Sequence, residues 1–435
     1  MRRRTLATAA AAGLVLALGA CSSGGGGDSA GADGGDGPIT LEYWAWGTAQ
    51  DGMVEAWNAA HPDVQVKKTD AGGSTDSSAK LLTATRAENA PDVAVVQYDT
   101  LPAMIVGGVA ADISEHTADV EAEFNPGVWS QVEFDGAVYG VPQDVGPQAM
   151  VYNQARFAEL GIPVPTTWAE FAAVAEQVKQ KDPTSTLATF APAEFGGFAA
   201  MAQQNGAQWW SVDGDAWTVS IDDEPSRQVA QYWQDLVDRG VIDAEPLLTP
   251  EWNAKLAAGK VLSWPSALWA NGVVNGVVPE QAGQWALAPI PAWQAGNPAV
   301  SFQGGSAVVV TTSSEHPEEA AEFAKWINTS KEGSAEQIEA GQYPASLVGQ
   351  ELTLSSAPPV QSPQQADYWQ VAQRIASSTV PEVSWGPNVN VANSAFQDAF
   401  NAAVTDGTPF TEALATVQEA VVADMEKSGF TVSAG

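Results

Sequence analysis

The sequence has few of the residues on which catalytic and metal sites depend. Of its 435 residues, one is cysteine and three are histidine. The cysteine is Cys21, so the chain after it can form no disulfide, thiolate metal site or catalytic thiol. His61, His116 and His316 are far apart, and no His-Glu-x-x-His, Gly-x-Ser-x-Gly or complete phosphate-loop motif occurs. We therefore expect no metal, no cofactor and no enzymatic activity.

Basic residues are also scarce. Lys and Arg number 18 against 52 Asp and Glu, which gives a formal net charge of -34. This charge disfavours nucleic acid and anionic membrane surfaces as partners and favours solubility. Hydrophobic residues make up 45% of the chain and 17 residues are Trp, which excludes a wholly disordered protein. We expect a monomeric globular body that binds no nucleic acid.

The N-terminus has the order of a secretory signal. Residues 2–4 are arginines, residues 6–18 form an apolar run, and small residues precede Cys21. The apolar run is shorter than the about 20 residues that a bilayer span requires. Leu18-Gly19-Ala20-Cys21 resembles the lipobox of bacterial lipoproteins, in which the cysteine is acylated and becomes the mature N-terminus. The alternative is an ordinary cleavage site beside a lone cysteine.

Residues 1–20 are accordingly predicted to be a lipoprotein signal peptide, and 21–37 an acylated cysteine with a disordered tether. Residues 22–37 contain only Gly, Ser, Asp and Ala, which bury too little apolar surface to offset the entropy of ordering. Acyl chains on Cys21 would hold the protein at the extracytoplasmic face of the cell membrane. The remaining body exceeds the roughly 250–300 residues at which a single core stops growing.

The body alternates between strand and helix patterns, which predicts an α/β protein. Extended runs at 39–46, 64–68 and 92–96 are separated by helical patterns, the second of them at 80–88. Later helices are predicted after the capping box at 167–170, before Gly240, from Pro317, and over 411–427. Four tryptophans on these helices are expected in the core: Trp57, Trp168, Trp233 and Trp326.

Six sequence blocks follow one another between residues 39 and 345. They are Leu41-Glu42-Tyr43-Trp44-Ala45-Trp46-Gly47 with Pro62-Asp63-Val64; Ala90-Pro91-Asp92-Val93 with residues 108–113; Asp135-Gly136-Ala137-Val138-Tyr139-Gly140-Val141-Pro142 with Val151-Tyr152-Asn153; Gly161-Ile162 with Pro165-Thr166-Thr167-Trp168; Gly259-Lys260 with residues 264–269; and Gly304-Gly305-Ser306 with Pro317-Glu318-Glu319-Ala320. In this order they resemble the extracellular solute-binding protein family 1, which includes the maltose-binding proteins.

The resemblance implies a two-lobe, type II periplasmic-binding-protein-like fold with a ligand cleft between the lobes. Lobe 1 is expected to comprise 38–145 plus 268–330, and lobe 2 to comprise 148–264 plus 334–435. Hinge segments are expected near 145–148, 264–268 and 330–334.

The same resemblance implies a function. The protein is expected to be the substrate-binding lipoprotein of an ABC importer, which captures a di- or oligosaccharide and delivers it to the membrane permease subunits. One alternative is a secreted lipoprotein glycosidase, since 52 acidic residues make chance carboxylate pairs certain. Another is a binding protein for a non-sugar solute such as a polyamine.

Sugars offer hydroxyls to polar groups and flat C–H faces to aromatic rings, so the cleft needs both. Trp269 lies ten residues after Gly259, where the resemblance implies a tryptophan that stacks on sugar; hinge packing is its alternative role. Trp46 and Thr48 follow the first strand and are further candidates. Trp44 or Trp46 could equally pack against the sheet.

Two pairs of polar residues are also candidates for ligand binding. Tyr98 and Asp99 follow a buried strand, and the resemblance implies a ligand-binding carboxylate there. A helix N-cap is the alternative role for Asp99. Gln143 and Asp144 lie on the strand that is expected to cross the hinge, where each is either a ligand contact or a satisfied hinge group.

The last candidates come from three loops. Trp209 and Trp210 are adjacent, so at most one is expected to reach the ligand. Gln303-Gly304-Gly305 suits a place where the backbone approaches a ligand closely. Trp385 and Asn388 precede a helix and are expected at the far side of the cleft.

Overall fold

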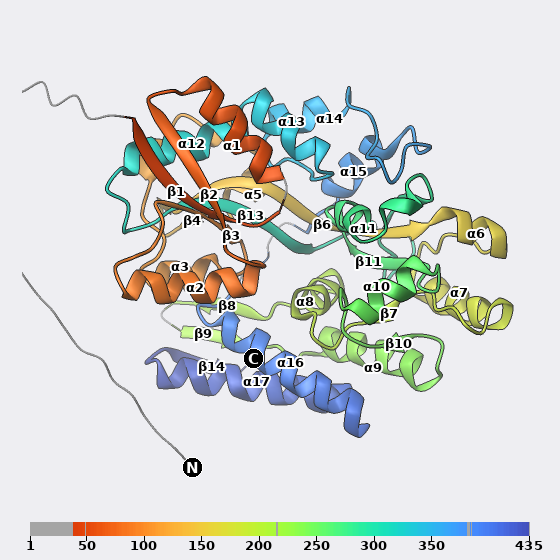
Figure 1. Ribbon diagram of the computed structural model, residues 1–435. Helices are drawn as coiled ribbons and strands as arrows, with labels where there is room; N and C mark the ends of the chain where they lie inside the picture. The colour runs from red at the N-terminus through yellow and green to blue at the C-terminus, as the bar shows by residue number, and fades with distance from the viewer. Residues whose placement is uncertain (1–37, 48, 215, 381–382, 384, 435) are drawn as a thin grey trace, which may run out of the picture. The chain divides into compact units, whose positions relative to one another are not determined.

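The computed structural model describes residues 38–435 except 48, 215, 381–382, 384 and 435 (Figure 1). The predicted signal, Cys21, the tether and Thr48 therefore lie outside the described residues. In the described part of the chain, no helix combines the length and the apolarity needed to cross a bilayer. Strands and helices alternate along this part, which confirms the predicted α/β class.

One sheet has the strand order β11-β6-β13-β3-β1-β2. β1 (Ile39–Ala45) pairs in parallel with β2 (Val64–Asp70) and β3 (Val93–Gln97), while β13 (Phe302–Val310) runs antiparallel to β3. The first four residues of β3 are all buried, as expected for a strand covered on both faces. Helices lie on both sides of this sheet (Figure 1).

Three helices pack on strands of this sheet. α1 (Ala49–Ala60) contacts β2 and α12 (Pro317–Thr329), and α12 also contacts β13. α2 (Ser74–Arg86) contacts β3. Residues Ala320, Phe323, Ala324 and Ile327 of α12 are fully buried, so the spacing read from the sequence marks the core face of this helix.

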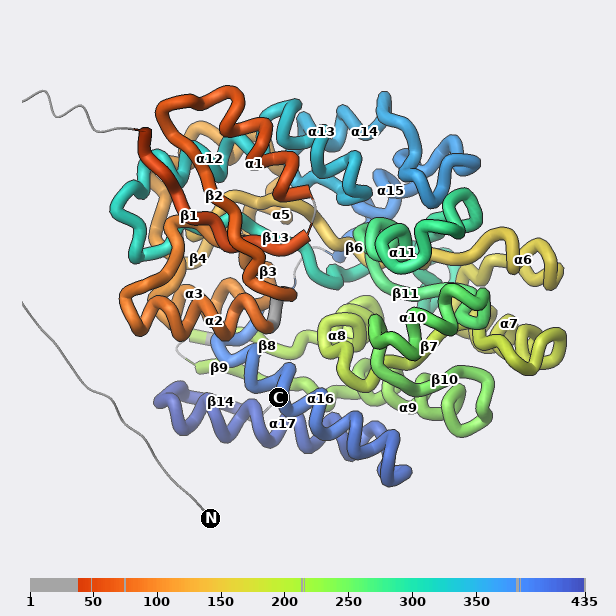
Figure 2. Tube along the Cα trace, viewed as in Figure 1, coloured from red at the N-terminus to blue at the C-terminus, as the bar shows by residue number. Residues whose placement is uncertain are grey.

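A single long strand, β6 (Val141–Asn153), connects two groups of elements (Figure 2). Its residues 141–147 pair with β13. Its residues 148–153 pair with β11 (Ser263–Ala267) on one edge and with β12 (Trp285–Pro289) on the other. β6 therefore lies where a hinge between two lobes is expected.

Helices pack together beyond β6. α7 (Trp168–Lys181), α8 (Phe195–Gln204) and α9 (Glu224–Asp238) follow in the chain, and α8 packs on α9. The long C-terminal helices α16 (Val389–Asp406) and α17 (Phe410–Lys427) pack on each other and on α8 and α9, respectively.

The remaining elements are short. They are α3 (Leu101–Val106), α4 (Ser114–Thr117), η1 (Glu121–Glu123), α5 (Pro126–Trp129), β4 (Glu133–Phe134), β5 (Ala137–Val138), α6 (Gln154–Leu160), β7 (Thr189–Phe190), β8 (Trp210–Asp213), β9 (Ala216–Val219), β10 (Asp243–Ala244), α10 (Pro250–Ala257), α11 (Ala270–Val277), η2 (Pro279–Gln281), α13 (Lys331–Glu339), α14 (Leu347–Thr353), α15 (Tyr368–Ala376) and β14 (Thr431–Ala434).

Two segments contact elements that the predicted boundaries assign to the other lobe. β12 falls in the stretch assigned to lobe 1, but it pairs with residues 149–153 of β6. α13 falls largely in the stretch assigned to lobe 2, but it packs on α1. The second half of β6 is buried, so both of its backbone edges need partners, and the apolar β12 supplies one. The lobe boundaries themselves stay a prediction.

Three of the four tryptophans expected in the core are buried: Trp57, Trp168 and Trp233. Trp326 is only partly buried, so for this residue the expectation is wrong. Its ring packs edge-on against Trp57 at 5.6 Å between ring centroids. Trp326 lies next to the apolar stripe of α12 rather than in its centre, which leaves part of the indole open to solvent.

Candidate functional site

A cavity of about 460 Å³ opens where the carboxyl ends of β1 and β3 meet β6, β13 and the start of α11. Ligands in α/β proteins commonly bind at this edge of a sheet. The residues that line the cavity are Trp46, Gly47, Ala49, Gln50, Gln97, Asp144, Leu248, Trp269, Gly272, Val273, Gly305, Ser306, Ala340 and Gln342. Four predicted site residues, Trp46, Asp144, Trp269 and Gly305, thus meet in one place.

Trp269 is held in a fixed orientation at this cavity. It directly precedes α11 and is partly exposed. Its indole Nε1 donates a hydrogen bond of 2.7 Å to the carbonyl oxygen of Gln303. Its ring lies edge-on to Trp264 at 5.6 Å between ring centroids. An aromatic ring fixed in this way loses little conformational entropy when a ligand packs on it.

Trp46 is the second aromatic residue of the cavity. It follows the last residue of β1 and is partly exposed. Trp44, two residues earlier, is also partly buried but does not belong to the cavity lining. Of the two tryptophans left open by the sequence, the structure therefore places Trp46 at the cavity.

Asp144 is the carboxylate of the cavity. Its side chain is 7% exposed, and its Oδ1 accepts a hydrogen bond of 2.5 Å from the hydroxyl of Ser306. Burial raises the pKa of Asp144 to about 6, although the Ser306 hydrogen bond acts in the opposite direction. A buried carboxylate of this kind is stabilised in its charged form when a ligand donates further hydrogen bonds to it.

Tyr98 and Asp99 lie behind the cavity wall. The hydroxyl of Tyr98 donates a hydrogen bond of 3.1 Å to the carbonyl oxygen of Asp144. Burial raises the pKa of Asp99 to about 6, and its Oδ1 has no hydrogen-bond partner among the described residues. Neither residue belongs to the lining, so a direct ligand contact by either stays a prediction.

The glycines of β13 let its backbone pass close to Tyr98. Gly304 and Gly305 have φ angles of 76° and 92°, which only glycine adopts readily. A Cβ atom on Gly305 would lie 2.9 Å from the Tyr98 ring and 3.1 Å from the backbone nitrogen of Gly146. The sequence predicted a close backbone approach to a ligand here, and the structure shows a close approach within the protein, with Gly305 at the cavity surface.

Three glutamines of the lining were missed in the sequence. Gln50 comes from the first turn of α1, Gln97 ends β3, and Gln342 follows α13. The side-chain oxygens of Gln50 and Gln342 are buried and accept no hydrogen bond from any described residue. Gln97 directly precedes the predicted Tyr98 and could have been found by its place at a strand end. Gln50 and Gln342 carry no sequence signal, because only tertiary packing brings them here.

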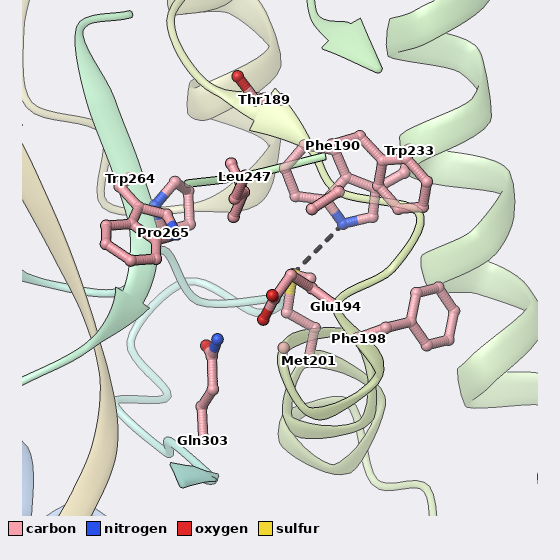
Figure 3. A pocket seen from close by; sticks show the side chains of 12 residues that line it. Thr189, Phe190, Glu194, Phe198, Met201, Trp233, Leu247, Trp264, Pro265 and Gln303 are labelled. Carbon is pink, nitrogen blue, oxygen red and sulfur yellow. Dashed lines mark hydrogen bonds between the residues drawn. The ribbon is translucent and has the colours of Figure 1, made fainter. Parts of the chain in front are cut away.

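A second cavity has a volume of about 30 Å³ (Figure 3). Gln303 lines it with its side chain, while the Gln303 carbonyl group holds Trp269. Glu194, which precedes α8, also lines it, and burial raises the pKa of its carboxyl group. A space of this size holds about one or two water molecules and is too small for a sugar ring.

The other predicted residues lie outside the large cavity. Gln143 is fully buried, and its backbone carbonyl oxygen accepts a hydrogen bond of 3.1 Å from the side-chain amide of Gln337. Asn388 donates hydrogen bonds to the Val421 carbonyl oxygen and to the Asp424 carboxylate, which bind it to α17.

Trp209, Trp210 and Trp385 belong to one aromatic cluster. Trp209 and Trp210 are both 1% exposed, and Trp209 donates a hydrogen bond of 2.8 Å to Ser226. Trp385 is partly exposed and packs against Phe195 and Trp210. The sequence predicted that at most one of the adjacent tryptophans reaches a ligand; both rings are buried, and a ligand contact by either stays a prediction.

The fold and the cavity at its strand ends are those of a ligand-binding α/β protein. The sequence profile of the bacterial extracellular solute-binding proteins matches residues 26–333, and the chain belongs to this family. The resemblance found in the sequence is thereby confirmed.

Individual relatives and solved structures agree with this assignment. The arabinooligosaccharide-binding protein of Halalkalibacterium halodurans is 25% identical over 316 residues, 69% of each chain. The lactose-binding protein of Rhizobium radiobacter is 26% identical over 88% of this chain and 92% of its own. The galacto-N-biose-/lacto-N-biose I-binding protein of Bifidobacterium longum, solved with lacto-N-biose, is 26% identical with a TM-score of 0.81 over 92% of this chain and 100% of its own. The predicted type II, two-lobe fold is thus confirmed.

Proposed function

We propose that the protein captures a di- or oligosaccharide in the 460 Å³ cavity and delivers it to the permease of an ABC importer. The observation that carries this proposal is the pairing of two partly exposed tryptophans, Trp46 and Trp269, with the amide residues Gln50, Gln97 and Gln342 in one cavity lining. Indole rings pack on the C–H faces of sugars, and amide oxygens accept hydrogen bonds from their hydroxyls. The volume lies within the roughly 300–1,000 Å³ of small-molecule sites.

The charge of the cavity limits the ligand further. Asp144 is the one charged residue in its described lining, which contains no Lys or Arg. An acidic sugar would thus bring a second negative charge beside Asp144 with no cation to balance it. A neutral sugar avoids this repulsion and can donate hydroxyl hydrogen bonds to the carboxylate. We therefore expect neutral oligosaccharides to bind and uronic acid derivatives to be rejected.

The names of the relatives support this ligand class. Arabinooligosaccharides, lactose and lacto-N-biose are the ligands in the names of the three proteins compared above. Because the family consists of solute-binding proteins, we expect the ligand to leave the site chemically unchanged. A glycosidase would instead release shorter sugars from an oligosaccharide that binds.

A thermal-shift screen of the purified body against neutral and acidic mono-, di- and oligosaccharides tests the function. A ligand that binds only the folded form stabilises it by about 2.7 kcal/mol at a hundredfold excess over Kd, so a true ligand raises the melting temperature clearly. Solution scattering on the same sample should then show a smaller radius of gyration, because the lobes close. Chromatography of the ligand after incubation should show no product.

Three results would contradict the proposal. They are stabilisation by a polyamine but by no sugar, tight sugar binding without compaction, and hydrolysis of the bound sugar.

We also propose that the protein is anchored through acylated Cys21. A lipoprotein of Streptomyces antibioticus, 34% identical over 40% of each chain, supports this proposal. Cys21→Ser removes the thiol that carries the acyl chain, so the variant is expected in the medium rather than in the membrane fraction. Immunoblots of the two fractions measure the distribution. Ser23→Ala is the matched control and should stay in the membrane fraction. If Cys21→Ser stays there as well, the protein is not anchored in this way.

A further inference from the structure

Leu248 combines two features that are unusual for leucine. Its φ angle is 58°. The other described non-glycine residues with a positive φ are Glu88 and Asp135. In this left-handed region the Cβ atom of an L-residue crowds the following carbonyl oxygen, a conformation that short polar residues tolerate better than leucine. The side chain is also 45% exposed, and it lines the 460 Å³ cavity.

The turn at Leu248 places two neighbouring leucines in two different cavities. Leu247 lines the small cavity, where it lies near Phe190 and Trp264 (Figure 3). Leu248 lines the large one. In the described lining of the large cavity, Leu248 is the residue from the loop between β10 and α10, whereas Trp46 and Trp269 come from the ends of β1 and β11.

The helix that follows does not require a leucine at this position. Thr249 caps α10, and its hydroxyl accepts a hydrogen bond of 3.2 Å from the backbone of Trp252. An apolar residue just before an N-cap often packs on the fourth residue of the helix. Here that residue is Asn253, a polar side chain, so the usual apolar contact cannot form. Helix capping therefore explains Thr249 but leaves Leu248 unexplained.

We propose that Leu248 is a specificity residue that packs on the apolar C–H face of the bound carbohydrate. The inference rests on the proposed function. It adds to the site a ligand-contacting residue that the sequence did not reveal. Backbone strain of this kind persists when another gain compensates for it, and functional sites are where such strain is commonly found. Closure on a sugar supplies this gain, because it removes the exposed leucine side chain from water. A ligand too short to reach Leu248 should bind more weakly than one that covers it.

Substitutions at Leu248 separate its ligand contact from its backbone role. Leu248→Asn keeps a residue that tolerates the left-handed conformation but removes the apolar side chain. We expect about a three- to tenfold loss of affinity, measured by titration calorimetry with the best sugar of the screen. The melting temperature of the free protein should stay the same or rise. Leu248→Met keeps an apolar side chain and should bind within about twofold of the parent.

Leu354→Asn is the matched control. Leu354 is 42% exposed, directly follows α14 and lies outside the cavity lining, so its substitution should leave affinity unchanged. If the parent binds no carbohydrate, the proposed function fails and this inference fails with it. If the parent binds and Leu248→Asn binds equally well, the inference alone fails. A large fall in the melting temperature of free Leu248→Asn would instead assign Leu248 to folding.

Discussion

Trp269→Ala is expected to weaken carbohydrate binding by about ten- to 150-fold, or roughly 1.5–3 kcal/mol. The indole is partly exposed at the cavity and is fixed by its hydrogen bond to Gln303 and by its contact with Trp264. A fixed aromatic ring of this kind is the type of anchor whose truncation commonly costs 2 kcal/mol or more. Calorimetry with the sugar found by screening measures the effect.

Trp269→Phe is the matched variant. It keeps an aromatic ring but loses the N–H that donates to Gln303, so an intermediate loss of affinity is expected. Trp269→Ala should lower the free energy of unfolding by less than it weakens the free energy of sugar binding, because part of the ring already contacts solvent in the free protein. If Trp269→Ala binds sugar like the parent yet unfolds far more easily, the ring serves hinge packing. Trp46, the other tryptophan of the cavity lining, would then be the stacking residue.

Trp168→Ala is expected to lower the free energy of unfolding by about 3–5 kcal/mol. Trp168 is 1% exposed, its ring lies against Phe171 and Trp233, and its Nε1 donates a hydrogen bond of 3.1 Å to Gln204. The substitution leaves a large cavity in the core and leaves the Gln204 oxygen without this donor. Denaturant unfolding measures the loss.

Trp326→Ala is the comparison for this variant and should cost clearly less, since its ring is partly exposed. The folded fraction of Trp168→Ala should bind sugar as the parent does, because Trp168 is not part of the cavity lining. An equal loss of stability in the two variants would show that the exposure of the tryptophan ring does not determine how much unfolding free energy its removal costs.

Apolar spacing predicted the first three strands and several of the longer helices, and it failed where small polar residues fill the interior. α12 begins at Pro317 and α17 ends at Lys427, as the sequence indicates. α2 begins at Ser74, six positions before the predicted start at residue 80. Ser77 and Ser78 are buried on its first turns, and a buried serine leaves no apolar pattern to read.

The sequence likewise predicted some residues of the candidate site and missed others. Trp46 was found because it follows the first strand, Asp144 because it lies on the predicted crossing strand, and Gly305 because paired glycines suit a close approach of the backbone. Gln342 and Leu248 reach the cavity through the packing of a helix end and a loop, which no local pattern encodes.

The adjacent tryptophans show a further limit of local rules. Strand alternation predicted that Trp209 and Trp210 point in opposite directions, so that at most one of them reaches a ligand. β8 begins only at Trp210, so Trp209 precedes the strand and the alternation does not apply. Trp209 packs on Phe195 and Trp210 on Trp385, and both rings are buried.

The position of β3 between β1 and β13 has a consequence for how the chain folds. The hydroxyl of Thr311, directly after β13, bonds to the carbonyl of Pro91, 220 positions earlier. Contacts of such high sequence separation form slowly, because a long loop must close first. A chain that emerges amino end first therefore leaves one edge of the apolar β3 unpaired until β13 arrives. Until then, the unpaired edge of β3 is the place where the incompletely folded chain would pair with other copies and aggregate.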